Sequence, residues 1–126
     1  MPYLIDSDVL IDVYRGNVRA QKYVDALPEA WGLSQVSALE LIVGARNKEE
    51  LARTDKFLSD YLIVPLQAPI GARAYELLKK YAKSHGLHVF DSLIAATALE
   101  ENLTLVTRNR KHFAMIEGLS LDVPAY

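Results

Sequence analysis

Short apolar runs alternate with stretches of helical periodicity along almost the whole of the 126-residue sequence. The runs, which are typical of buried strands, cover residues 3–5, 31–33, 62–64, 104–107 and 119–123. Helical patterns fill the intervals, at residues 9–14, 18–27, 37–45, 49–61, 69–85 and 91–101. Strands that alternate with helices favour a parallel sheet covered by helices on both faces. We therefore expect an α/β fold with a central parallel sheet.

The size and composition of the chain indicate one domain, residues 1–126, with no repeat or linker. Apolar residues make up 51% of it, which suits a globular protein. The absence of cysteine excludes a disulfide scaffold and a thiolate metal site, and it agrees with a reducing compartment. No basic leader opens the sequence and no apolar run approaches the ~20 residues of a membrane span. We expect a cytoplasmic protein with no membrane partner.

The charge balance bears on contact with nucleic acid. The net charge is −2, whereas a dedicated duplex-DNA binder usually carries a basic excess. Contact with RNA would therefore need a local basic patch. Arg108, Arg110 and Lys111 follow the expected strand at 104–107, and Arg15 and Arg19 could extend their patch. A solvated helix start is the alternative interpretation of this run.

Three carboxylates stand at junctions between expected elements. Asp6 ends the first apolar run in "YLIDSDVLID", Glu40 lies in the first turn of a helix in "SQVSALELIVGA", and Asp91 begins a helix after "HGLHVF". The functional crevice of an open α/β sheet lies outside the carboxyl ends of its strands. The sequence thus predicts that the three carboxylates meet at one rim.

Each carboxylate taken alone also has a structural interpretation. Ser37 and Glu40 match the S-x-x-E capping box, in which Glu40 would bond back to its own helix start. Asp91 and Asp8 are of the residue type that caps helix N-termini. Asp12, one helical turn beyond Asp8, is expected to be a solvated surface residue.

A cluster of three carboxylates needs protons or cations, because two of them about 4 Å apart repel by about 4 kcal/mol at an effective dielectric near 20. Without cysteine, an oxygen-only site favours Mg²⁺ or Mn²⁺ over Zn²⁺. Such a site suits phosphodiester hydrolysis. The three histidines have no ligand spacing: we expect His85 at a helix end, His88 in a loop and His112 on the surface.

Four segments, in order, resemble the motifs of PIN-domain ribonucleases, specifically the VapC-type toxins of toxin–antitoxin pairs. They are "LIDSDVLID", "SALELIVGA", "FDSLIAATALEENLTLVTRN" and "KHF", and they cover most of the chain. The resemblance implies a three-layer α/β/α sandwich, Mg²⁺- or Mn²⁺-dependent cleavage of RNA, a homodimer and a cognate antitoxin protein.

The resemblance also implies roles for individual residues. Asp6 and Asp91 would be direct metal ligands, and Glu40 would orient the metal or the attacking water. Ser7 and Thr107 would line the site, and Asp8 would hold the loop of Asp6 or lie just outside the metal ligands. Asn109 stands where many members carry an acid, so it belongs to the catalytic set but puts a second metal in doubt.

Two other functions remain open from the sequence. One is a catalytically silent PIN-like module that binds RNA or protein, although such a module has no need for mutually repelling acids. The other is a haloacid-dehalogenase-type phosphatase using Asp6 and Asp8, for which the lysine and paired-acid motifs are missing. The sequence does not identify the RNA target.

Overall fold

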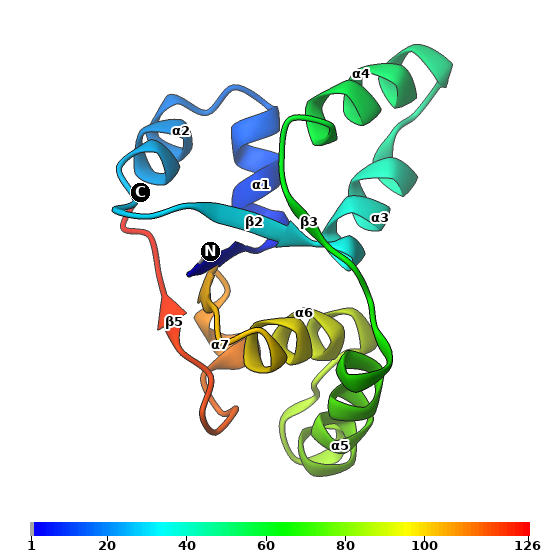
Figure 1. Ribbon diagram of the computed structural model, residues 1–126, viewed down its shortest axis with the longest axis vertical. Helices are drawn as coiled ribbons and strands as arrows, with labels where there is room; N and C mark the ends of the chain where they lie inside the picture. Colours follow the sequence, from blue (N-terminus) through cyan, green and yellow to red (C-terminus); the bar gives the residue numbers. More distant parts are fainter. Residues whose placement is uncertain (1) are drawn as a thin grey trace.

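The computed structural model describes residues 2–126, which form a parallel sheet between two layers of helices (Figure 1). Its strands are β1 (Tyr3–Ile5), β2 (Trp31–Ser34), β3 (Ile63–Val64), β4 (Thr104–Val106) and β5 (Leu121–Asp122). Its helices are α1 (Ser7–Tyr14), α2 (Val18–Asp25), α3 (Gln35–Gly44), α4 (Lys48–Leu58), α5 (Ala68–His85), α6 (Val89–Glu100) and α7 (Arg110–Phe113). The predicted α/β/α sandwich is confirmed.

The strands run in the order β3-β2-β1-β4-β5, and every pairing between them is parallel. The first half of the chain builds the sheet outward from β1 to β3, and the second half builds it outward from β4 to β5. The chain thus reverses its direction of growth between β1 and β4. Ligands of open α/β sheets bind at such a switch point, outside the carboxyl ends of the strands.

Alternating side chains of the strands divide the core into two clusters, one on each face of the sheet. Leu4 and Leu105 contact the α5–α6 side, whereas the next residues, Ile5 and Val106, contact the side of α1 to α4. Figure 1 shows α1 to α4 on one face of the sheet and α5, α6 and α7 on the other. Both faces are therefore covered, as strands without polar alternation require.

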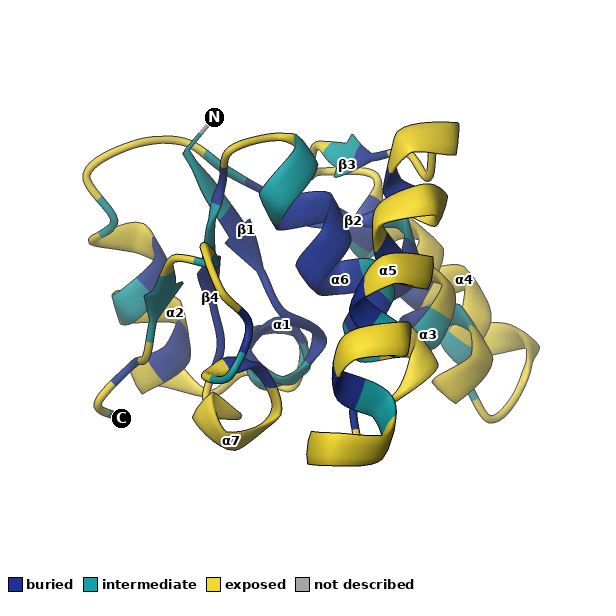
Figure 2. Ribbon diagram, turned by 90° about the horizontal axis from the view of Figure 1, so that it is seen from below, coloured by how far each residue is buried: buried dark blue, intermediate teal, exposed yellow. Residues whose placement is uncertain are grey.

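Helix α6 is the central helix that its apolar sequence predicts. Residues 94–98 are all buried, and the helix lies between the sheet and α5 (Figure 2). Helix α5 covers it with one apolar stripe, formed by Ile70, Ala74, Leu77 and Tyr81, and exposes the opposite side. Among residues 2–126, no helix combines the length and apolarity that crossing a membrane would need.

Helices α1, α3 and α6 each begin two residues before the start that the sequence predicts, because their N-caps lie earlier; α1 begins at Ser7, after its N-cap Asp6. Helix α3 begins at Gln35 instead of Ser37, because the Ser34 hydroxyl accepts from the backbone N–H of Val36 at 3.1 Å. Helix α6 begins at Val89, with His88 at the N-cap. Glu40 consequently lies in the second turn of α3, and Asp91 in the first turn of α6.

Candidate active site

Asp6 is the first residue beyond β1 and lies at the switch point. Its backbone N–H donates to Val106 O at 2.9 Å, which extends the pairing of β1 with β4 by one residue. Its side chain is only 4% exposed, and Oδ1 accepts from the Ser7 backbone N–H at 2.7 Å, which makes Asp6 the N-cap of α1. The strand and the helix together fix this carboxylate at the rim of the sheet.

Thr107 occupies the equivalent position beyond β4. Its hydroxyl donates to Asp6 Oδ2 at 2.7 Å, across the switch point, and accepts from the Asn109 backbone N–H at 3.0 Å. Thr107 is fully buried, so this bond is shielded from water. Asn109 itself is exposed, and its side chain makes no capping bond to α7.

Ser7 connects Glu40 to the first helix. Ser7 Oγ lies 2.8 Å from Glu40 Oε1 and 2.9 Å from Ser37 Oγ. A carboxylate only accepts, so the Ser7 proton goes to Glu40 and the Ser37 hydroxyl donates to Ser7. The capping-box interpretation of Ser37 and Glu40 is therefore wrong. Both side chains belong to the site, and their spacing of three residues, one helical turn, was the signal for Ser37.

Asp91 reaches the site from α6, on the other face of the sheet. Its Oδ2 lies 3.0 Å from Nδ1 of His112 in α7, and Asp91 and His112 are 21% and 48% exposed at their side chains. The interpretation of Asp91 as an N-cap is wrong, because His88 holds that position. His112 is a surface residue as expected, but its contact with Asp91 could not be predicted from the sequence.

The electrostatics show that the carboxylates act on one another. Burial, followed by the charge of Asp8, raises the pKa of Asp6 to about 7, and Asp91 adds to the rise. Burial raises the pKa of Glu40 as well, and the charge of Asp91 contributes there too. Asp91, from α6 on one face of the sheet, thus influences both Asp6 at the start of α1 and Glu40 in α3 on the other face.

Comparison with known proteins agrees with this geometry. Residues 3–119 match the sequence model of the PIN domain family. The chain belongs to the PIN-domain family. It is 39% identical to Ribonuclease VapC10 of Mycobacterium tuberculosis over 119 residues, covering 92% of this chain and 89% of the relative. It is 32% identical to Ribonuclease VapC19 of the same species over 120 residues, covering 92% and 95%.

Solved structures show the same likeness for this PIN domain. A toxin–antitoxin complex from Klebsiella pneumoniae contains a chain with a TM-score of 0.81 and 32% identity, with 97% of each chain covered. The VapBC2 complex from Rickettsia felis, bound to a promoter DNA fragment, gives a TM-score of 0.84 at 25% identity, with 98% of each covered. The resemblance to VapC-type proteins is confirmed.

Asp8 ties the rim of the PIN domain together. Its Oδ1 accepts from the Val9 backbone N–H at 2.7 Å and its Oδ2 from the Arg108 backbone N–H at 2.9 Å. It does not cap α1, because Asp6 does. Burial raises the pKa of Asp8. Asp8 thus joins the start of α1 to the segment after β4, and this role matches the one expected of it.

The interpretation of Asp12 as a solvated residue is wrong. Its Oδ2 accepts from Arg108 Nη1 at 3.2 Å and from the Tyr126 hydroxyl at 2.8 Å, and its side chain is 25% exposed. The Arg108 guanidinium also stacks over the Tyr126 ring, with Cζ 4.6 Å from its centroid. Arg108 is thereby committed to contacts within the protein.

The remaining basic candidates of the PIN domain occupy two separate places. Arg110 and Lys111 are exposed in α7, and Lys111 lines a hollow of about 360 Å³ that Asp91 and His112 also line. Arg15, at the C-terminal end of α1, lines a different hollow with residues of α3 and α4. Arg15 and Lys111 thus line different hollows, and the basic patch expected from the sequence stays a prediction.

The donor set of the rim fits a hard divalent cation. It consists of carboxylate, hydroxyl and amide oxygens, the ligands that Mg²⁺ and Mn²⁺ prefer. Burial raises the pKa of Asp6 and of Glu40, and the charge of Asp91 adds to both shifts; a bound cation would favour the charged form of each carboxylate. Among residues 2–126, however, no three acidic or histidine side chains already stand in a metal-binding arrangement. The donors fit by chemistry and not by finished coordination geometry.

Proposed function

We propose that this PIN domain is a metal-dependent endoribonuclease that acts as the toxin of a type II toxin–antitoxin pair. The observation that carries the proposal is the buried carboxylate of Asp6 at the switch point, with the charge of Asp91 acting on it. A metal-dependent nuclease needs a cation site, and these acids would supply one at the edge of the sheet. The relatives named ribonucleases support RNA as the substrate.

Asp6 and Asp91 would hold Mg²⁺ or Mn²⁺ directly. When bound, the ion supplies a Lewis acid that activates water and shields the charge on the phosphate. Ser7 would orient Glu40 through its 2.8 Å bond, so that the free oxygen of Glu40 can accept a proton from the attacking water. Thr107 would keep Asp6 ionised, because a donor to the charged form lowers its pKa.

Asn109 bears on the number of ions. An asparagine offers an oxygen ligand but removes one negative charge. A carboxylate at 4 Å would be worth roughly 8 kcal/mol to a divalent ion before desolvation, most of which desolvation cancels. We propose one well-held ion, with a second site tenfold or more weaker, as a net 1 to 2 kcal/mol implies.

The partners would be a cognate antitoxin protein, an RNA substrate and a second copy of the chain. The antitoxin is supported by the solved complexes, which are toxin–antitoxin assemblies by their own descriptions. The composition of the chain supports a cytoplasmic location, because it lacks cysteine.

Of the two alternatives, the phosphatase fails on family membership and on Asp8. Both oxygens of Asp8 accept from backbone N–H groups, which gives Asp8 a role in holding the loop. The silent binding module makes a different prediction from the nuclease: it would bind RNA and leave it intact in the presence of Mn²⁺.

The test is cleavage of defined single-stranded RNAs with Mg²⁺ or Mn²⁺, with and without chelator. We expect Asp6→Asn and Asp91→Asn each to lower the rate at least ~100-fold, the scale of removing one essential group. Asp55→Asn is the matched control, since Asp55 is an exposed residue of α4. Undiminished cleavage in excess chelator would refute the metal mechanism, and intact RNA with every ion would favour the silent module.

A further inference from the structure

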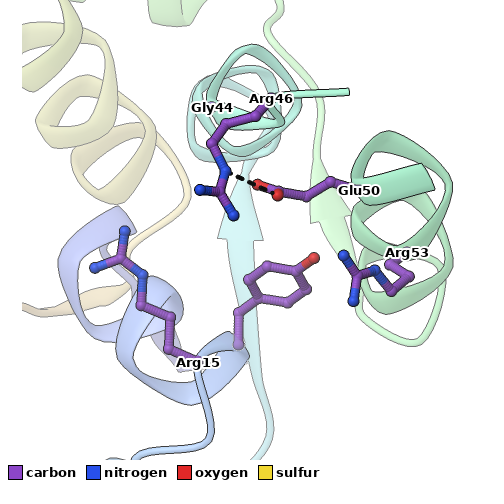
Figure 3. Close-up of a pocket in the computed structure, with 6 residues that line it drawn as sticks. Arg15, Gly44, Arg46, Glu50 and Arg53 are labelled. Carbon is purple, nitrogen blue, oxygen red and sulfur yellow. Dashed lines mark hydrogen bonds and ion pairs between the residues drawn. The ribbon is translucent and has the colours of Figure 1, made fainter. Parts of the chain in front are cut away.

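Beside the acidic rim, the fold forms a hollow of about 580 Å³ where the end of α1 faces the end of α3 and the first half of α4. Tyr14, Arg15, Gly44, Arg46, Glu50 and Arg53 line it. Figure 3 shows Arg15 on the α1 side, Arg53 on the α4 side and Arg46 between them, on the α3–α4 connection. We call this the arginine hollow.

Positive charge predominates in the arginine hollow, against the negative balance of the whole chain. Glu50 is the one acid in its lining, and its Oε2 accepts from Arg46 Nε at 3.1 Å. Within residues 2–126, Arg15 and Arg53 form no ion pair. Two guanidinium groups therefore face one space without an anion, an arrangement that repulsion disfavours and a bound anion would stabilise.

Contacts between α1 and α4 hold Tyr14 in the lining of the arginine hollow, and Gly44 leaves space in it. The Tyr14 hydroxyl bonds to Thr54 Oγ1 at 3.1 Å, and the Tyr14 ring packs against Phe57 with centroids 4.9 Å apart. Gly44 has neither a positive φ nor a close neighbour, since a Cβ built on it meets nothing within 4 Å. Packing does not require glycine there, and its missing side chain leaves the space free.

The arginine hollow continues toward the acidic rim. A smaller adjoining hollow of about 100 Å³ shares Tyr14, Arg15, Gly44 and Glu50 with it and is also lined by Glu40. Glu40 in turn accepts from Ser7 at the start of α1. Along α1, the nine residues from Asp6 to Arg15 correspond to roughly 14 Å. One extended strand can therefore touch both places.

We propose that the arginine hollow binds backbone phosphates of a single-stranded RNA whose scissile bond lies at the acidic rim. The inference rests on the proposed nuclease function and adds a direction for the substrate, along α1 between α1 and α3. Guanidinium groups suit this ligand, because their planar fork matches phosphate oxygens in a bidentate manner. Arg15 thus binds RNA together with Arg46 and Arg53 in the arginine hollow, and not as part of a patch with Arg108.

The test is binding of a labelled oligouridylate of about eight nucleotides, in chelator, so that the strand stays intact. The variant is Arg15→Gln with Arg53→Gln; the control is Lys48→Gln with Lys56→Gln, two exposed charges of α4 outside the hollow. We expect the arginine variant to bind roughly tenfold or more weakly. The slope of the logarithm of its binding constant against the logarithm of salt concentration should become less steep by about 1.4, because two phosphate contacts to a single strand are lost. The control should stay within about twofold of the unmodified protein.

A second pair of variants leaves the arginines in place. Gly44→Glu adds a carboxylate to the arginine hollow, and Gly44→Gln adds the same volume without charge. We expect Gly44→Glu to weaken oligouridylate binding severalfold more than Gly44→Gln. Equal binding by the arginine variant and the lysine control would overturn the proposal. So would an oligoglutamate peptide of equal length that binds the hollow as tightly as the RNA, since the ligand would then be a carboxylate peptide.

Cleavage with Mn²⁺, measured on the same proteins, separates this inference from the function on which it rests. RNA cut by a protein whose binding ignores Arg15 and Arg53 would keep the nuclease and remove the subsite. RNA bound through these arginines but never cut would keep the subsite and remove the nuclease.

Discussion

At the scale of single residues, the position of Asp6 makes the metal-free protein sensitive to pH. Its pKa rises from 3.8 to about 7 on folding, so the folded state binds the proton more tightly than the unfolded state. The contribution to stability is fully present below about pH 4 and is lost as the pH rises through 7. We expect the free energy of unfolding to fall by about 2 to 4 kcal/mol over this range in chelator.

Urea unfolding at a series of pH values measures this loss, with Asp6→Asn as the control. Asparagine keeps the size of the side chain and removes the titration, so the variant should lose the corresponding slope. Added Mn²⁺ should reverse the trend, because the ion competes with the proton. An identical pH dependence in the two proteins would contradict the raised pKa of Asp6.

Residues that end strands were predictable from the sequence, and residues that meet only in space were not. Asp6 follows the run at 3–5 and Thr107 ends the run at 104–107, and the parallel rule alone places them at one edge. The contact of His112 with Asp91 depends on how α7 packs beside α6, which no local pattern encodes. Glu40 was predicted as a site residue, but the start of its helix was placed too late, because Ser34 can cap a helix as well as Ser37 can.

At the scale of elements, most of the helices and strands were predictable, and their ends were less so. The breaks between α1 and α2 at Gly16, between β3 and α5 at Pro65 and between α5 and α6 at Gly86 have local causes, which periodicity and turn residues reveal. The strands β3 and β5 have two residues each, shorter than their apolar runs, because the edge of a twisted sheet pairs with one neighbour only. Which strands lie at an edge depends on the tertiary structure, and the apolar runs of the sequence do not reveal it.

Helix α5 offers a prediction at this scale, since two of its glycines have opposite roles. Gly86 ends the helix in the left-handed region at φ +70°, where a Cβ is strained. Gly71 lies inside the helix, and a Cβ there meets nothing within 4 Å. We expect Gly86→Ala to lower the free energy of unfolding by about 1 kcal/mol and Gly71→Ala to raise it by about 0.5 to 1 kcal/mol.

Chemical denaturation of the two alanine variants, side by side with the unmodified protein, measures both signs. Both variants replace an exposed glycine in or at the end of α5 with alanine. A systematic error of the measurement therefore affects both and cancels in their comparison. Two changes of the same sign would contradict the assignment of Gly86 as a left-handed cap.

At the scale of the whole molecule, the strand order could not be predicted from the sequence. The runs establish that a parallel sheet exists, but the order β3-β2-β1-β4-β5 depends on which face each crossover helix covers. Helices α1 to α4 share one face and α5 to α7 the other, so β4 joins β1 instead of β3 (Figure 1). That single choice brings Thr107 to Asp6 and creates the site.

The exposed apolar surface beside the site predicts a homodimer. Leu39 and Val43 lie on one side of α3 and are 53% and 84% exposed, while Val89 and Phe90, at the start of α6, are 59% and 58% exposed. Leu41, by contrast, is buried in the core of the same helix. Exposed large apolar residues are typical of interfaces where they form a patch. Leu39 immediately precedes Glu40 in the sequence, and Phe90 immediately precedes Asp91. A second copy bound there would border both acids.

We expect Val43→Glu to convert the dimer to a monomer at micromolar concentration, because a carboxylate buried in an apolar interface costs several kcal/mol. Val18→Glu is the matched control: Val18 is 63% exposed, but it lies on α2, which packs against α1 away from α3. Light scattering measures the mass of both variants and of the unmodified protein, and near-ultraviolet circular dichroism confirms that each is folded. A monomeric mass for the unmodified protein, or a dimer that survives Val43→Glu, would contradict an interface at α3. A dimer lost in Val43→Glu and kept in Val18→Glu would place the second copy at α3, beside the acidic rim and the proposed RNA path.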